Sequence, residues 1–516
     1  MKVHPAMLVK TNTRDKVSVF KLLRMAVWIG AIALAASAAH GQSEALAEKA
    51  QRAKEFMAAG RAAEAIPIYS ELVRSVPNNP GLILNLGLAL DMSGKKREAI
   101  EQYEAVLKLD ANSFPALLLM GTAYMDLGEP PKALAPLQRA VKLQPGNSDA
   151  QAMLAEAELG LNHFAEATRI FQDLSAADPS NAKVWYGLGS SYEGLAQNSF
   201  DALAELAHGS AYWLDLVAES RLETKQTYSA FYFYRQALEK MPSLRGAHAA
   251  IAEIYQQTGH ADWAATEQAK EAQLPPLDCN AQKLECAYRA GDLREIVAND
   301  AKTPEALYWK TRACNRLALE AYSHLAQLPP SGESYELRAR IDSKRRQYAE
   351  AAKELREARK LSPANPHLKR ELAIALYRSG SLEEAQGLFQ ELLQLDRDST
   401  VLNYFLGDTL LNSQKPQEAI GYLQKVVTHD VQFLAAQKSL GLAYLQLGEP
   451  DKAIPHLQAA LPADEDGTLH YQLGRAYQSH GDRELAREMF RKYQEAQQKH
   501  QQENQAVEKE VSITPP

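Results

Sequence analysis

Apolar residues recur three and four positions apart along most of the chain, on both sides of turn glycines. The stretch from Gly121 to Ala133 (GTAYMDLGEPPKA) returns almost unchanged from Gly441 to Ala453 (GLAYLQLGEPDKA). Spacings of three and four predict amphipathic α-helices, and a glycine between two of them predicts a tight antiparallel helix pair. The chain is therefore expected to repeat one helical hairpin.

The same skeleton recurs at intervals of about 34 residues. A small residue in the first helix is followed by an aromatic or Leu in the second, as in Gly87 with Tyr103 and Gly474 with Phe490. One hairpin cannot bury its own apolar face, so neighbouring hairpins must stack to make a core. We place units at 46–79, 80–113, 114–147, 148–181, 182–244, 245–278, 279–331, 332–365, 366–399, 400–433, 434–467 and 468–500.

Two of these units are too long. Gly189 and Tyr192 open the fifth, but its second-helix residues are expected at Ala230 and Tyr234, about 29 residues later than the repeat predicts. The surplus indicates a helical insert at about 195–229. The seventh unit carries a second surplus, so its pairing is expected to be irregular.

Composition agrees with repetition. A single core stops growing near roughly 250 to 300 residues, whereas this chain has 516. Charged residues make up 23% and hydrophobic residues 46%, which describes a folded protein and excludes disorder and collagen. Ala, Leu, Glu, Gln and Lys dominate, and runs of β-branched residues are almost absent, which argues against a sheet-based enzyme.

The N-terminus has the layout of a secretory signal peptide. Basic residues precede an apolar run from Met25 to Ala36, and small residues follow up to Gly41. The run has 12 residues, fewer than the roughly 20 of a membrane span. We expect an exported protein, periplasmic or secreted, with membrane contact only as an anchor if the segment is not cleaved. Without residues 1–41 the chain is more acidic than its net charge of -7, which disfavours nucleic acid as a partner.

The recurring small, aromatic, Gly, Ala, aromatic and Pro positions resemble the tetratricopeptide repeat (TPR) family, of an exported bacterial type. The resemblance implies an all-α fold, a TPR alpha-solenoid in which antiparallel helix pairs form a right-handed superhelix. The expected parts are a signal peptide at 1–41, an N-terminal array at 42–278 with the insert at about 195–229, an irregular unit with three cysteines at 279–331, a C-terminal array with a capping helix at 332–500 and a disordered tail at 501–516.

In this family the first helix of each pair lines a concave groove. Carried over to this chain, the N-terminal array presents an apolar set and the C-terminal array a basic and aromatic set. An alternative is that the first set packs between repeats and the second is an ordinary solvated face. The candidate groove residues are Leu84, Leu88, Met92, Leu118 and Met125, and then Arg340, Arg370, Tyr377, Arg378, Tyr404, Lys438, Tyr471 and Arg475.

Aromatic residues concentrate around the insert, among them Tyr212, Trp213, Tyr228 and Tyr234. Such rings form either an exposed platform for a partner or the packing of lengthened helices. All three cysteines fall in the irregular unit. Cys279 and Cys286 are candidates for a disulfide if Cys279 lies before a helix start, and otherwise they are too far apart.

No catalytic, cofactor or metal motif is present: the sequence has no HExxH, no GxSxG, no phosphate-binding glycine loop and no close cysteine pair. We therefore expect a non-catalytic scaffold that binds a protein or peptide in its groove. The alternatives are a structural or tethering subunit of an envelope secretion or polysaccharide-export complex, and an enzyme that uses the aromatic insert as a carbohydrate or peptide site.

Overall fold

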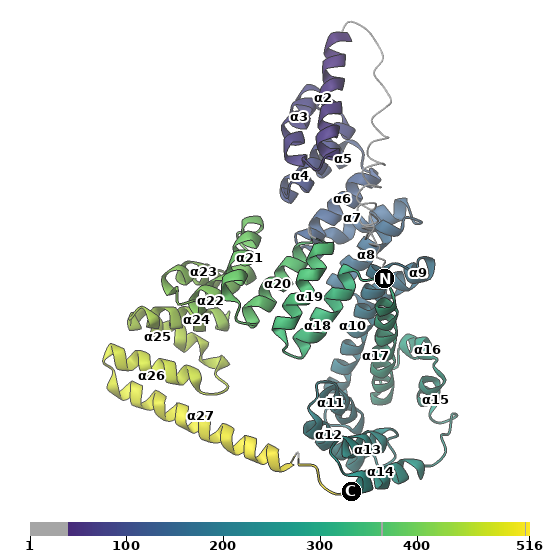
Figure 1. Ribbon diagram of the computed structural model, residues 1–516, viewed down its shortest axis with the longest axis vertical. Helices are drawn as coiled ribbons and strands as arrows, with labels where there is room; N and C mark the ends of the chain where they lie inside the picture. The colour runs from purple at the N-terminus through teal and green to yellow at the C-terminus, as the bar shows by residue number, and fades with distance from the viewer. Residues whose placement is uncertain (1–39, 363–364, 511) are drawn as a thin grey trace, which may run out of the picture. The chain divides into compact units, whose positions relative to one another are not determined.

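A computed structural model describes residues 40–362, 365–510 and 512–516, and every regular element in these ranges is a helix. The predicted all-α class is confirmed. The predicted signal peptide, residues 1–41, lies outside the described residues except for its last two, which belong to the first helix drawn in Figure 1. The chain divides into two compact units, Met1–Pro179 and Ser180–Pro516.

The first unit is a series of antiparallel helix pairs. Each helix packs on the next one along the chain. Its helices are α2 (His40–Ala58), α3 (Ala62–Ser75), α4 (Pro80–Met92), α5 (Lys96–Leu109), α6 (Phe114–Asp126), α7 (Pro130–Leu143), α8 (Ser148–Gly160) and α9 (Phe164–Ala177).

The pair α4 and α5 shows how the sequence makes each hairpin. The Asn79 side chain accepts two backbone N–H groups of the first turn of α4, at 3.0 and 3.1 Å, and Pro80 occupies its first position. The turn out of α4 passes through Gly94 at φ +80°, which favours glycine. A Cβ on Gly87 would lie 2.7 Å from the Tyr103 ring, so the small residue lets the two helices approach closely.

The second unit begins with a long helix whose partner is far away in sequence. Its helices are α10 (Ala182–Ala207), α11 (Ala211–Glu223), α12 (Thr227–Lys240), α13 (Ala247–Gln257), α14 (Ala261–Ala272), α15 (Lys283–Ala290), α16 (Leu293–Ala298), α17 (Pro304–Gln327), α18 (Gly332–Lys344), α19 (Tyr348–Leu361), α20 (Pro366–Arg378), α21 (Leu382–Leu395), α22 (Thr400–Asn412), α23 (Pro416–His429), α24 (Leu434–Gln446), α25 (Pro450–Ala460), the 3-10 turn η1 (Leu461–Ala463), α26 (Thr468–His480) and α27 (Arg483–Glu510).

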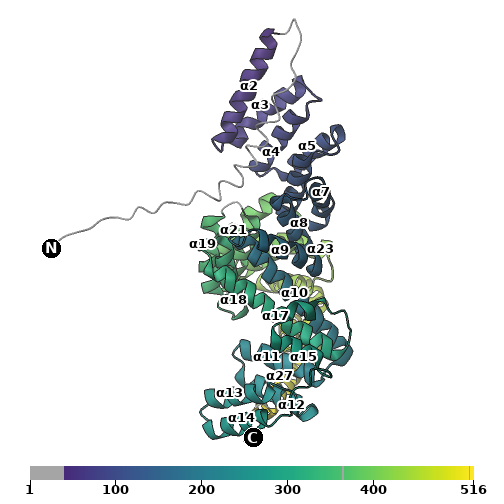
Figure 2. The ribbon, with the colours of Figure 1, turned by 90° about the vertical axis from the view of Figure 1, so that its right-hand side faces the viewer.

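Helix α10 pairs with α17, and both views of the ribbon show them side by side (Figures 1 and 2). The Ser190 hydroxyl lies 3.3 Å from that of Tyr322, 132 positions further on. A Cβ on Gly189 would lie 2.3 Å from the Tyr322 ring, the same small-to-aromatic contact that joins α4 and α5. Helices α10 and α17 therefore form one repeat hairpin that a long insertion interrupts.

This pairing corrects the sequence prediction for the fifth and seventh units, 182–244 and 279–331. Ala230 and Tyr234 of α12 are buried, but α12 packs on α11 and α13 instead of α10. The first helix of the predicted fifth unit pairs with the second helix of the predicted seventh. The insertion is α11–α16, longer than the predicted 195–229, and α15 and α16 are short helices packed on α17.

The C-terminal helix is longer than expected. Helix α27 continues to Glu510, so the prediction of a disordered tail from Gln501 is wrong. Residues 501–510 are rich in Gln and Glu and contain no Gly or Pro, a composition that favours a helix. Residues 512–516 follow without regular structure.

Candidate partner-binding surface

The apolar groove predicted on the first unit is smaller than the sequence suggests. Leu84 and Leu118 are 8% and 3% exposed and belong to the core, so their assignment to a groove is wrong. Leu88 and Met125 are half-buried, and Met92 is 40% exposed at the end of α4. Helix α4 packs on α3, α5 and α6, and a helix covered on several sides is apolar around most of its circumference. Three of the five predicted residues remain accessible.

Paired charges that the sequence analysis missed lie beside this patch. The Lys96 ammonium contacts Asp91 of α4 at 2.7 Å and Asp126 of α6 at 2.5 Å. Burial raises the pKa of Asp91. The three groups join two successive first helices, so their charges serve the stacking of repeats.

Exposed cations lie on the first helices of the C-terminal repeats. Arg370 and Arg378 belong to α20, Lys438 to α24 and Arg475 to α26, and all four side chains are exposed. Within the described part of the chain none of the four has an ion-pair partner. The Arg378 guanidinium carbon lies 5.4 Å from the centroid of the Tyr348 ring. These four predicted residues can therefore meet a partner without breaking an existing salt bridge.

A buried carboxylate connects two of the helices that carry these cations, α20 and α24. Asp408 of α22 accepts hydrogen bonds from the hydroxyl of Tyr377 on α20, the hydroxyl of Ser439 on α24 at 2.5 Å and the amide of Asn412 at 2.9 Å. Three donors satisfy the charge of a carboxylate that water barely reaches. Tyr377, predicted as a groove residue, thus joins successive first helices. No pattern in the sequence indicates this role, because it depends on neighbours about one repeat away.

The two remaining predicted aromatics differ in accessibility. Tyr404 is half-buried, with its ring centroid 5.0 Å from that of Phe433, and burial raises its pKa to about 12. Tyr471 is exposed, and its ring lies 5.3 Å from Tyr493 of the last helix. Tyr471 is therefore the accessible one of the pair.

Arg340 does not belong to the exposed set. Its guanidinium donates to the hydroxyls of Tyr322 and Ser190 and lies 3.1 Å from the Glu193 carboxylate. It also lies 5.3 Å from the centroid of the Tyr186 ring. This arginine connects α18 to the α10–α17 hairpin, so its charge is already paired within the chain.

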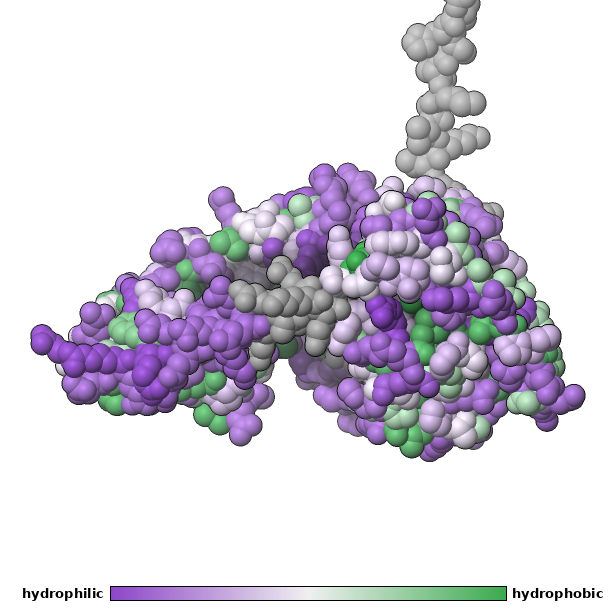
Figure 3. All heavy atoms as spheres, turned by 90° about the horizontal axis from the view of Figure 1, so that it is seen from below, coloured by the Kyte–Doolittle hydropathy of each residue, from purple (hydrophilic) through white to green (hydrophobic). Residues whose placement is uncertain are grey.

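Most aromatic rings of the insertion are packed. Tyr212 lies 4.7 Å from Tyr308, and Trp213 lies 4.2 Å from His208, between ring centroids. Tyr228 is the exception at 58% exposed. On the face that Figure 3 draws, apolar residues form separate patches among polar ones. The rings around α11 and α12 therefore act mainly as packing, the second of the two interpretations.

A network of buried and half-buried charges joins the insertion to α17. The Tyr308 hydroxyl donates to Asp215 at 2.7 Å, and Arg312 lies 2.6 Å from both that hydroxyl and the Glu219 carboxylate. Asp215 is 2% exposed. Burial raises the pKa of Asp215, and it raises that of Glu219 to about 7. One cation thus balances two carboxylates that are costly to charge in this position.

The cysteines take two roles. Cys279 and Cys286 form a disulfide, with Cα atoms 5.6 Å apart, and Cys279 lies before the start of α15, the condition that the sequence required for bridging. Cys314 is free and buried in α17, and burial raises the pKa of its thiol to about 12. A thiol so hard to ionise is a packing residue.

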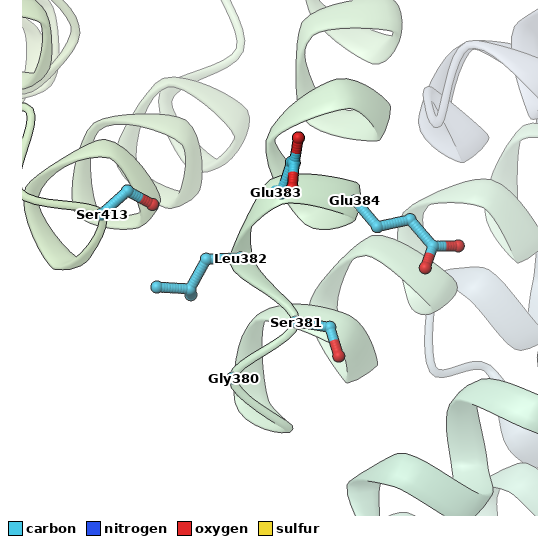
Figure 4. A pocket seen from close by; sticks show the side chains of 6 residues that line it. All are labelled: Gly380, Ser381, Leu382, Glu383, Glu384 and Ser413. Atoms are coloured by element: carbon cyan, nitrogen blue, oxygen red, sulfur yellow. The ribbon is translucent and has the colours of Figure 1, made fainter.

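An open hollow of about 650 Å³ lies between the start of α21 and the end of α22. Figure 4 shows Leu382 and Ser413 facing the space between the two helices and Glu384 pointing away from it. Glu384 accepts from Arg356 at 2.6 Å. The residues that line the hollow are Gly380, Ser381, Leu382, Glu383, Glu384 and Ser413. They contain no nucleophile beside a base and no set of metal ligands.

Within residues 40–362, 365–510 and 512–516 no three His, Cys, Asp or Glu side chains are placed to hold a metal ion. In the same ranges no helix is both long and apolar enough to cross a membrane.

The tetratricopeptide repeat family matches the chain at residues 50–114, 84–148, 124–190, 344–408, 404–468 and 468–500. These stretches together span more than half of the chain. They leave out 191–343, where most of α10 and the insertion lie, because the insertion separates the two halves of one repeat.

No curated protein matches the sequence. Similar solved structures include MamA from Desulfovibrio magneticus RS-1, with 26% identity over 33% of this chain and 96% of that chain at a TM-score of 0.31. Another is a tetratricopeptide repeat protein from Parabacteroides merdae, with 14% identity over 64% of this chain and 99% of that chain at a TM-score of 0.32. Because the matched repeats recur in both units and coincide with the observed helix pairs, the chain belongs to the tetratricopeptide repeat family.

Proposed function

We propose that the protein is a non-catalytic scaffold that binds an acidic segment of a partner protein on the first helices of its C-terminal repeats. The observation that carries this proposal is the row of exposed cations without ion-pair partners, Arg370, Arg378, Lys438 and Arg475. Tetratricopeptide repeats use extended surfaces of this kind to bind proteins.

Electrostatics favours an acidic ligand at this surface even though the whole chain carries a net charge of -7. Charges that meet a partner of opposite sign steer its approach and determine which partner fits. The hydrogen bonds to Asp408 fix the spacing between α20, α22 and α24, so the cations on α20 and α24 are presented at a set separation. Binding of this type weakens as salt is added, because exposed charges are screened.

Reversing two of these charges is expected to abolish partner capture. In a crosslinking pull-down from the native envelope, the double variant Arg370→Glu/Arg378→Glu should recover at least about tenfold less partner than the parent chain, because attraction becomes repulsion.

The matched control is Lys353→Glu/Lys425→Glu, which makes the same charge change at exposed sites on the second helices α19 and α23. It should capture partner at the parent level. Equal capture by the parent and the α20 variant would rule out the basic surface. Equal loss in the α20 variant and the control would show that only net charge matters.

We also propose that the protein is exported. The basic and apolar N-terminal segment supports this location, and the Cys279–Cys286 disulfide suits an oxidising compartment. In cell fractionation the chain should appear in the periplasm or medium, and its mass should be that of a chain cleaved near residues 38 to 41. Recovery in the cytoplasm with a full-length N-terminus would contradict export. Recovery with membranes would instead favour the tethering subunit of an envelope complex.

A further inference from the structure

The last residues of the chain lie on the insertion. The Thr514 carbonyl accepts a hydrogen bond of 2.6 Å from the Tyr255 hydroxyl, and the Thr514 hydroxyl accepts one from the Arg235 guanidinium. Ile513 and Thr514 are half-buried, whereas Ser512 is exposed. These two polar contacts hold Thr514 on helices more than 250 positions earlier in the sequence.

The receiving surface is aromatic and basic. The ring of Tyr255 on α13 lies 5.4 Å from Phe231 of α12 and 5.5 Å from Trp263 of α14, between centroids. His260 stacks on Trp263 at 4.1 Å, and the Arg235 guanidinium lies 5.9 Å from the centroid of the Phe231 ring. Rings from α12 and α14 thus pack on Tyr255 of α13, and this packing fixes the direction of the hydroxyl donor. Arg235 lies over a ring of its own helix.

The bound segment has the chemistry of a proline-type ligand. Thr514 precedes Pro515 and Pro516, and a residue before proline is restricted to extended conformations. Such segments lose little entropy on binding, and proteins recognise them with aromatic rings and with donors to their free carbonyls. A tyrosine hydroxyl donating to a carbonyl next to a proline is a contact of this kind.

We propose that helices α12, α13 and α14 form a binding site for extended Thr-Pro-Pro peptides, and that the chain fills this site with its own residues 512–516. This site differs from the basic surface of α20–α26, so it stands independently of the proposed function. A partner that carries a similar segment must displace the tail. The tail therefore competes with such a partner from within the same chain.

Peptide binding to a truncated chain tests the site. A fluorescent peptide of sequence VSITPP, residues 511–516, should bind the chain that ends at Glu510 at least about tenfold more tightly than it binds the full chain, because a tethered tail competes at millimolar effective concentration. In the truncated chain, Tyr255→Phe should weaken binding by about three- to tenfold, since it removes one hydrogen bond and keeps the ring. Tyr228→Phe, on an exposed ring of α12, is the matched control and should change nothing. Equal binding to the truncated and full chains, or equal affinities of the Tyr255 and Tyr228 variants, would overturn the proposal.

A second measurement follows the tail in the full chain and does not depend on the affinity of a short peptide. With ¹³C-labelled isoleucine methyl groups and Ile513→Val to assign the signal, the Ile513 methyl should relax as part of the folded body at all protein concentrations. It should sharpen to a mobile signal in Tyr255→Phe and in Arg235→Ala, but not in Tyr228→Phe. A mobile signal in the parent chain would overturn the proposal. An ordered signal that appears only as the chain dimerises would overturn occupancy within one chain and assign the site to a second copy.

Discussion

Gly189→Ala is expected to lower the free energy of unfolding of the second unit by about 1–3 kcal/mol. The added Cβ would lie 2.3 Å from the Tyr322 ring, closer than real Cβ atoms come to a neighbour, in the contact between α10 and α17. Neither long helix can move away easily, because Arg340 connects both of them to α18. Urea unfolding followed by circular dichroism would measure the loss.

The matched control is Gly387→Ala in α21, where a Cβ meets no atom within 4 Å. It should be neutral or slightly stabilising, because alanine favours a helix more than glycine does. A double-mutant cycle then identifies the partner helix. In the background of Tyr322→Ala the cost of Gly189→Ala should disappear, whereas in the background of Tyr234→Ala it should remain in full. The opposite pattern would restore a hairpin between α10 and α12 and contradict the interrupted repeat.

The regular hairpins were predictable because their determining contacts are local. Gly87 meets Tyr103 and Gly441 meets Leu457 within one repeat, so a fixed spacing in the sequence reports a contact in space. Helix type follows equally from the apolar period and from turn residues such as Gly94. These signals suffice for the fold class and for most helix pairs.

The insertion within the α10–α17 hairpin was not predictable, because two segments carry the same second-helix pattern. Both α12 and α17 carry an alanine followed four positions later by tyrosine: Ala230 with Tyr234, and Ala318 with Tyr322. The nearer segment fits the repeat order, but the farther one packs on Gly189. Only tertiary packing distinguishes them, and no local spacing records it.

The candidate binding surface was likewise predictable only in part. Arg370 and Arg378 are exposed as predicted, because a cation on a solvated helix face needs no partner. Arg340 also lies on the first helix of its repeat, yet it contacts Glu193 and Tyr322 from the interrupted hairpin. Which cations stay exposed depends on which helices are neighbours, so it could not be known before the pairing of α10 with α17.

Arg312→Met is expected to destabilise the insertion by about 3–5 kcal/mol near pH 8, because it leaves the buried Asp215 and the half-buried Glu219 without their cation. Arg312 lies 2.6 Å from Glu219, and Tyr308 connects it to Asp215. Burial already raises the pKa of Glu219 to about 7 and raises that of Asp215, and the loss of Arg312 removes the main opposing attraction. Unfolding of the purified chain and limited proteolysis of α11–α16 would measure the effect.

The raised pKa values determine how the loss of stability in Arg312→Met changes with pH. A carboxyl whose pKa is raised in the folded state holds more protons folded than unfolded, so stability falls as pH rises from the unfolded value toward the folded one. For Glu219 in the parent chain that window extends from about 4.3 to about 7. In Arg312→Met this window extends to higher pH. The difference in free energy of unfolding between parent and variant should therefore be small at pH 5 and increase toward pH 8. Adding Glu219→Gln should recover part of the loss. Arg316→Met, one turn further along α17 and paired with exposed Glu320, should cost less than about 1 kcal/mol at every pH. A pH-independent loss in Arg312→Met would mean that its packing matters and its charge does not.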